Sequence, residues 1–161
     1  MSTLAVNASL FVGAFAVMEG VAWLTHKYVM HGPLWCWHRS HHEPHEGPFE
    51  LNDLFAVIFS LPSIGMIYLG MRGDSAWLWA GLGVMAYGVA YMLFHDGIVH
   101  RRFRVPFAAR SRYWRRLIQA HRLHHAVRDR DGAVSFGFLW APRPQVLKEQ
   151  LVANRARRPG N

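Results

Sequence analysis

The sequence predicts an all-α integral membrane protein in which about three transmembrane helices support a histidine-rich helical cap. Hydrophobic residues make up 52% of the chain and charged residues 17%, whereas soluble domains usually contain about 25% charged residues. Three apolar segments approach the roughly 20 residues that a helix needs to cross a bilayer. Ten of the eleven histidines lie in four short motifs near the ends of these segments. The length of 161 residues fits one membrane-embedded domain, residues 1–161.

The first expected span covers residues 4–24 and continues as a helix to His31, where Gly32 and Pro33 give a stop signal. Glu19 lies inside this span. Because a carboxylate within a membrane is costly, Glu19 is a functional candidate. Two roles stay open for it: it orients a metal-binding histidine and shapes the floor of the site, or it forms a hydrogen bond between helices.

Residues 34–53 form a polar connection that carries three histidines at positions i, i+3 and i+4 of an expected helix. A segment that contains proline and glycine, residues 43–48, then ends that helix. His45 within it is expected in a loop or in contact with a metal ligand. Asn52 and Asp53 are favourable N-cap residues for the helix that follows.

The second and third spans are expected at residues 54–71 and 76–94, neither of which contains a charged residue. A short polar turn, residues 72–75, joins them as an antiparallel pair. Three crossings place all four histidine motifs on one side of the membrane. Seven arginines follow the third span within residues 101–116, so the positive-inside rule predicts that this side and the C-terminus are cytoplasmic.

The C-terminal third is expected to lie at the membrane surface. Residues 105–125 are expected to form one amphipathic helix that is apolar at Trp114, Leu117 and Ile118. The apolar segment 134–142 is too short to span, so it is expected to enter the interface and line a pocket, and a re-entrant fourth segment stays open. Residues 155–161 at the end of the polar tail are expected to be disordered.

The histidine motifs repeat one pattern twice, HX4H followed by HX2HH. Scattered structural histidines would not repeat a spacing. Neutral imidazole binds iron, zinc and copper well, and ten imidazoles suffice for two ions with about five nitrogen ligands each. Haem needs only a few histidines within the spans, and a zinc store or exporter would mix carboxylates with histidines. The expected metal ligands are His26, His31, His38, His41, His42, His95, His100, His121, His124 and His125.

The histidines of the HX2HH and HX4H motifs are expected to lie at different angles around a helix. Positions i, i+3 and i+4 are expected to converge on one point, whereas i and i+5 differ by about 140° at 100° per residue. Two explanations for the HX4H motif stay open. Either the two histidines of a pair bind different metals, or the helix unwinds at its end, as Gly32 and Gly97 would permit.

The histidine motifs around a membrane hairpin resemble those of the integral-membrane fatty acid hydroxylase and sterol desaturase superfamily. Two further stretches, His38 to Asp53 (HRSHHEPHEGPFELND) and Val134 to Pro142 (VSFGFLWAP), look like bacterial beta-carotene 3-hydroxylases, as does the compact length. The resemblance covers most of the chain, about residues 10–145.

This resemblance implies a non-haem di-iron monooxygenase that uses O2 to hydroxylate C3 of each beta-ionone ring. Such an enzyme converts beta-carotene through beta-cryptoxanthin to zeaxanthin, and it can act on ring-ketolated carotenoids toward astaxanthin. The resemblance also implies a ferredoxin-type electron donor and a place in the bacterial cytoplasmic membrane.

A carotenoid is an apolar rod dissolved in the bilayer, so its ring would meet a site at the ends of the spans. Aromatic residues are expected to wall the pocket: Trp23, Trp35, Phe94, Phe136 and Phe138. Asp96 is expected to contact a metal ligand rather than a metal.

The arginine-rich face serves as a positive-inside anchor and could also dock an acidic ferredoxin. Membrane lipids are expected partners, and nucleic acid is not, because no nucleic-acid motif is present.

Two other functions stay open. The same chemistry on a fatty acid or sterol would be distinguished by product analysis. A non-enzymatic membrane protein that binds a metal or haem would be distinguished by its absorbance spectrum and its metal content.

Overall fold

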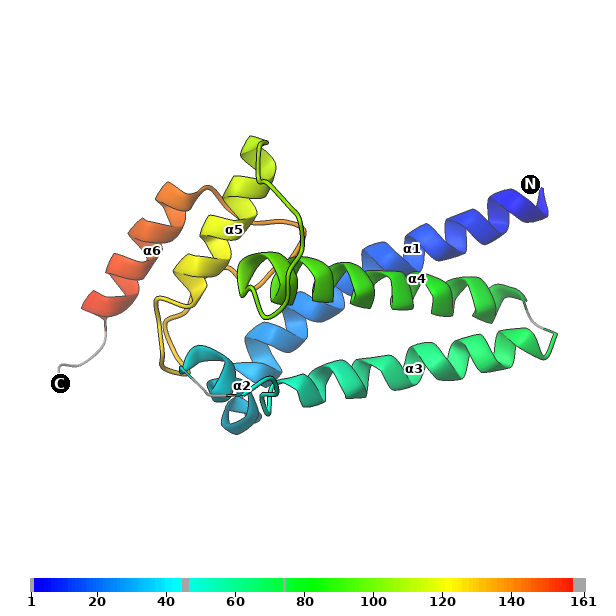
Figure 1. Ribbon diagram of the computed structural model, residues 1–161, viewed down its shortest axis with the longest axis horizontal. Coiled ribbons are helices and arrows are strands. Elements are labelled where there is room, and N and C mark those ends of the chain that lie inside the picture. The colour runs from blue at the N-terminus through cyan, green and yellow to red at the C-terminus, as the bar shows by residue number, and fades with distance from the viewer. Residues whose placement is uncertain (1, 45–46, 74, 158–161) are drawn as a thin grey trace.

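The computed structural model describes residues 2–44, 47–73 and 75–157, and every regular element in these ranges is a helix. Three long helices lie together, and three shorter ones gather at the end farthest from the N-terminus (Figure 1). In chain order the elements are α1 (Thr3–Leu24), η1 (Thr25–Met30), α2 (Trp35–His42), α3 (Asp53–Met71), α4 (Ser75–Tyr91), η2 (Met92–Val99), α5 (Arg112–His124) and α6 (Pro144–Ala156).

Three helical stretches among the described residues are long and apolar enough to cross a membrane: Thr3–Met30, Asp53–Met71 and Ser75–Val99. They contain the expected spans, so the predicted fold class is confirmed. α4 packs against both α1 and α3. Glycine permits these contacts, since a Cβ at Gly83 would lie 2.3 Å from the Phe11 carbonyl oxygen and one at Gly70 would lie 2.2 Å from the Leu78 nitrogen.

The first and third spans both end in π-helix, at η1 and η2. The His31 N–H donates to the His26 carbonyl at 3.0 Å, and the His100 N–H donates to the His95 carbonyl at 2.9 Å. These i to i+5 bonds widen the helix in the two HX4H motifs. Both histidine pairs therefore lie on π-helical turns and not on a straight α-helix.

The expected helix over residues 105–125 is wrong in its first part. Residues 105–110 are not helical, and α5 begins at Arg112 after Ser111, whose hydroxyl accepts from the Trp114 N–H at 3.3 Å. Pro106 disfavours helical geometry at the residue before it, and Ser111 supplies an N-cap that starts a helix later. The helix keeps its predicted apolar face, with Leu117 buried.

The expected disorder from residue 155 onward is also wrong for its first residues, because α6 extends to Ala156. Pro144 stands in the first turn of α6, where proline is favourable, and Leu147 and Leu151 are buried on one face at i, i+4 spacing. The burial of these two leucines stabilises α6, a helix that the polar composition of this segment does not predict. Residues 158–161 lie outside the described ranges.

The Asn52 side chain does not cap α3 as expected, since it makes no capping hydrogen bond. It contacts a histidine instead, as described below. The buried core lies where α4, η2, α5 and α6 meet the irregular segment 127–140, and it includes Tyr87, Phe94, Leu117, Val134, Phe138 and Leu147. This core holds the histidine-bearing elements against the ends of the long helices.

Candidate metal centre

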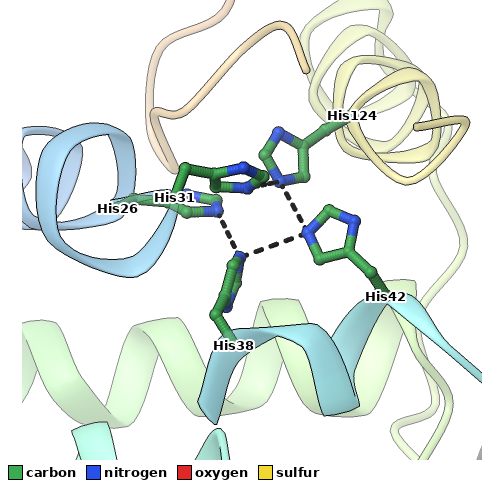
Figure 2. A group of neighbouring side chains, drawn as sticks. All are labelled: His26, His31, His38, His42 and His124. Atoms are coloured by element: carbon green, nitrogen blue, oxygen red, sulfur yellow. Dashed lines mark hydrogen bonds between the residues drawn. The ribbon is translucent and has the colours of Figure 1, made fainter. Parts of the chain in front are cut away.

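The structure gathers the ten repeated histidines into two groups, named here site 1 and site 2. Site 1 consists of His26, His31, His38, His42 and His124, whose ring nitrogens lie within 4.8 Å of one another. Figure 2 shows these rings directed at a common centre from η1 and the residue that follows it, from α2 and from α5. Site 2 contains His41, His100, His121 and His125 within the same distance, and His95 Nε2 lies 3.1 Å from His41 Nε2.

Each HX2HH motif divides its histidines between the two sites. His38 and His42 face site 1, whereas His41 faces site 2. In the second copy His121 and His125 face site 2, whereas His124 faces site 1. The expectation that all three converge on one point is wrong, because positions i+3 and i+4 differ by 100° around a helix. Each site therefore takes one histidine from the other copy of the repeat.

Each HX4H pair serves a single site. His26 and His31 both belong to site 1, and the rings of His95 and His100 lie 4.6 Å apart at site 2. Of the two explanations for this spacing, the change in helix geometry is the one found. The π-helical i to i+5 bonds place the two residues above one another.

The Nδ1 atom of each site 1 imidazole faces an oxygen atom that accepts a hydrogen bond from it. Four acceptors are backbone carbonyls and the fifth is the Asn52 side-chain oxygen, at 2.7 Å from His38 Nδ1. The carbonyl partners are Phe136 for His26, Arg130 for His31, Val127 for His42 and Val134 for His124, at 2.7–3.1 Å. These contacts fix the proton on Nδ1 and direct each Nε2 toward the centre.

Carboxylates take the same role at site 2. Glu50 Oε2 accepts from His41 Nδ1 at 2.8 Å, and Asp96 Oδ1 accepts from His95 Nδ1 at 2.7 Å. Arg102 lies between these carboxylates, since it forms two 2.7 Å bonds to Asp53 and approaches Glu50 and Asp96 at 4.0 and 3.9 Å. Asp96 therefore contacts a histidine of the expected ligand set.

Burial keeps the His42 and His100 imidazoles neutral near pH 7, because it lowers the pKa of His42 to about 4 and that of His100 to about 3. With Nδ1 protonated, the Nε2 atoms of His38 and His42 face each other with lone pairs at 3.2 Å, an arrangement that a cation between them would stabilise. The buried Nε2 of His125 has no hydrogen-bond partner among the described residues. This donor set fits metal ions at both sites.

Glu19 does not contact a histidine through any of its identified hydrogen bonds. One oxygen accepts from the N–H groups of Phe138, Leu139 and Trp140, and the other accepts from the Tyr87 hydroxyl at 2.8 Å. The Tyr87 contact joins α1 to α4, and the role of Glu19 at the histidine sites stays a prediction. His45 lies outside the described residues.

Sequence reasoning missed Glu50, Asn52 and Arg102. The sequence predicts a helix cap at Asn52 and a positive-inside charge at Arg102, and neither pattern indicates a contact near the histidines. Glu50 follows His41 by nine residues on a connection without helical period, so its contact depends on how that connection folds back.

A cavity of about 20 Å3 borders both sites. His26 of site 1 lines it together with His95 and His121 of site 2, and its apolar walls include Phe94, Phe136 and Phe138. Trp23 does not line this cavity; its ring lies 6.0 Å from that of Tyr28. Trp35 packs against the rings of His31 and His42 instead.

Comparison with known proteins gives one family and many relatives. Residues 11–142 match the family described as fatty acid hydroxylase. The beta-carotene hydroxylase of Pantoea ananas is 50% identical, over 96% of this chain and 88% of that protein. The beta-carotene hydroxylase of Paracoccus sp. (strain PC1) is 44% identical over 93% of each chain. Beta-carotene 3-hydroxylase 2 of Arabidopsis thaliana is 42% identical, over 93% of this chain and 51% of its own length. No solved structure matches the chain.

Proposed function

The chain belongs to the fatty acid hydroxylase family, and we propose that it hydroxylates C3 of the beta-ionone rings of beta-carotene. The products are beta-cryptoxanthin and then zeaxanthin, and ring-ketolated carotenoids are further substrates toward astaxanthin. The observation that carries this proposal is the pair of imidazole sites that border one cavity with phenylalanine in its walls, in a chain 42–50% identical to beta-carotene hydroxylases.

Two iron ions are the proposed cofactors, held by the five histidines of site 1 and the five of site 2. Hydroxylation of an unactivated C–H bond requires a redox-active metal, which excludes zinc. Bound iron would supply activation of O2, and each turnover would consume O2, two electrons and two protons, insert one oxygen atom and release one water. The acceptors at Nδ1 orient the imidazoles before any substrate arrives.

The apolar cavity is the proposed position of the reacting ring carbon. Phe94, Phe136 and Phe138 exclude water from the face shared by the two sites. A volume of about 20 Å3 holds roughly one water molecule, so these side chains must move apart to admit a beta-ionone ring. The cavity lies at the end of the spans, where a carotenoid dissolved in the bilayer could reach it.

Electrons are proposed to come from a ferredoxin-type donor on the cytoplasmic side of the bacterial inner membrane. The segment after η2 exposes Arg101, Arg104, Arg110, Arg112 and Arg115. Clustered positive charge of this kind speeds association with an acidic protein at low ionic strength.

Pigment analysis tests the proposed reaction. We expect the chain, expressed in bacteria that accumulate beta-carotene, to produce beta-cryptoxanthin and zeaxanthin in extracts separated by chromatography. The variant His121→Ala, present in membranes at the same level, is expected to leave beta-carotene unchanged. Unchanged beta-carotene with the wild-type chain, membrane insertion and electron donor confirmed, would reject this substrate and favour a fatty acid or sterol.

Cys36 provides a test of the proposed orientation. It is the single cysteine of the chain and is exposed on α2, on the side of the histidine sites. We expect a membrane-impermeant maleimide to label it in inside-out vesicles but not in intact spheroplasts. The variant Ser2→Cys in a Cys36→Ser background is the matched control, with the opposite pattern expected. Labelling of Cys36 in spheroplasts would reverse the assigned orientation.

A further inference from the structure

Residues 127–140 form one irregular segment, named here the strap, that runs along site 1. The strap supplies the acceptor for four of the five site 1 imidazoles. Its carbonyls at Val127, Arg130, Val134 and Phe136 accept from Nδ1 of His42, His31, His124 and His26. The direction of four Nε2 atoms therefore depends on where this one segment lies.

Glu19 holds the C-terminal end of the strap from within the first span. A single carboxylate oxygen accepts from three consecutive N–H groups, those of Phe138, Leu139 and Trp140, at 2.9, 2.9 and 3.2 Å. The approach is close, since a Cβ at Gly137 would lie 3.1 Å from this oxygen and 2.6 Å from the Trp140 carbonyl oxygen. Consecutive N–H groups directed at one anion form a concave binding site for negative charge.

Asn154 of α6 holds the strap at a second point, since its side-chain N–H group donates to the Gly132 carbonyl at 3.1 Å. These two anchors come from a membrane-spanning helix and the C-terminal helix. A third contact comes from α5, where the Tyr113 hydroxyl donates to the Leu139 carbonyl of the strap at 2.6 Å. The acceptors identified at site 2, Glu50 and Asp96, lie outside the strap.

We propose that Glu19 is a positioning residue for the metal of site 1, which it controls by anchoring the strap, with Asn154 as the second anchor. A carboxylate within a membrane helix is costly and needs a role that offsets this cost. Among the described residues, the hydrogen bonds of Glu19 reach the strap and Tyr87 but neither metal site, so its effect passes through the carbonyls of the strap. This inference rests on the proposed function, because it requires that site 1 binds a metal.

The test measures iron binding to the full-length chain in lipid nanodiscs, titrated with 57Fe(II) under anaerobic conditions. The variant Glu19→Ala removes the oxygen that accepts from the three N–H groups at the end of the strap. We expect iron affinity at site 1 to fall about 10- to 100-fold and iron affinity at site 2 to stay unchanged. Mössbauer spectra identify the site that loses iron, with His124→Ala and His41→Ala as references for loss of site 1 and site 2.

Two further variants separate positioning from general damage to the fold. Glu19→Gln keeps one oxygen that can accept from the three N–H groups, so we expect it to restore most of the binding. Tyr87→Phe removes only the helix-to-helix hydrogen bond of Glu19, so we expect wild-type iron content at both sites.

Wild-type binding at both sites in Glu19→Ala would overturn the proposal. If Glu19→Ala loses iron equally from both sites, or fails to fold, the variant Asn154→Ala becomes the test. The proposal then requires that Asn154→Ala lowers iron affinity at site 1 alone, and any other result overturns it. A wild-type chain that binds no iron would instead reject the metal centre itself and this inference with it.

Discussion

Replacing His41 by alanine is expected to remove the metal from site 2 and to leave site 1 loaded. The other two histidines of its motif, His38 and His42, belong to site 1, so position in the sequence alone gives the opposite expectation. His41 Nε2 lies 3.1 Å from His95 Nε2, and its Nδ1 is fixed by Glu50. The substitution therefore removes a donor nitrogen that Glu50 holds in a fixed direction toward site 2.

The variant His38→Ala is the matched control, because it removes an imidazole three residues away on the same helix. We expect it to deplete site 1 and spare site 2. Iron per chain and Mössbauer spectra of the two variants measure this difference. Both variants are expected to reduce zeaxanthin formation by at least about 100-fold, since the proposed reaction uses both metals. Loss of the same metal in both variants would contradict the exchange of histidines between the two copies of the repeat.

Replacing Glu50 by alanine is expected to weaken metal binding at site 2 about 10- to 100-fold. The Glu50 side chain is only 4% exposed, and it accepts from His41 Nδ1 at 2.8 Å. Without this carboxylate, the His41 imidazole loses its fixed direction and part of its basicity. Arg102, which approaches Glu50 at 4.0 Å, also loses one of the charges that surround it. Anaerobic iron titration of the purified variant measures the effect.

Glu43→Ala is the matched control for Glu50→Ala. Glu43 caps the end of α2 and forms a 3.6 Å pair with Arg39 in which both side chains are about half exposed. Exposed pairs contribute at most about 1 kcal/mol to stability, so we expect wild-type iron content and activity. An unchanged affinity in Glu50→Ala, or an equal loss in both variants, would show that the Glu50 carboxylate does not support site 2.

The membrane helices follow from local composition, and the sequence was sufficient to predict them. Apolar segments of spanning length have one favourable environment, so α1, α3 and α4 lie where residues 4–24, 54–71 and 76–94 indicate. The number of crossings then brings the ends that carry histidines together. Elements outside the bilayer are less predictable from sequence. The helix α6 depends on burial of Leu147, and the late start of α5 depends on the Ser111 cap.

The doubled set of ten histidines, suited to two metals, could be predicted without a structure, since repeated spacing and ligand chemistry are local properties. The division of these histidines between the two sites depends on how the helices fold together. A helix separates neighbours such as His41 and His42 by 100°, so that His41 meets His95 of η2 whereas His42 meets His124 of α5. The same holds for Glu50, Asn52 and Glu19, whose partners are nine or more residues away in sequence and come together only when the chain folds.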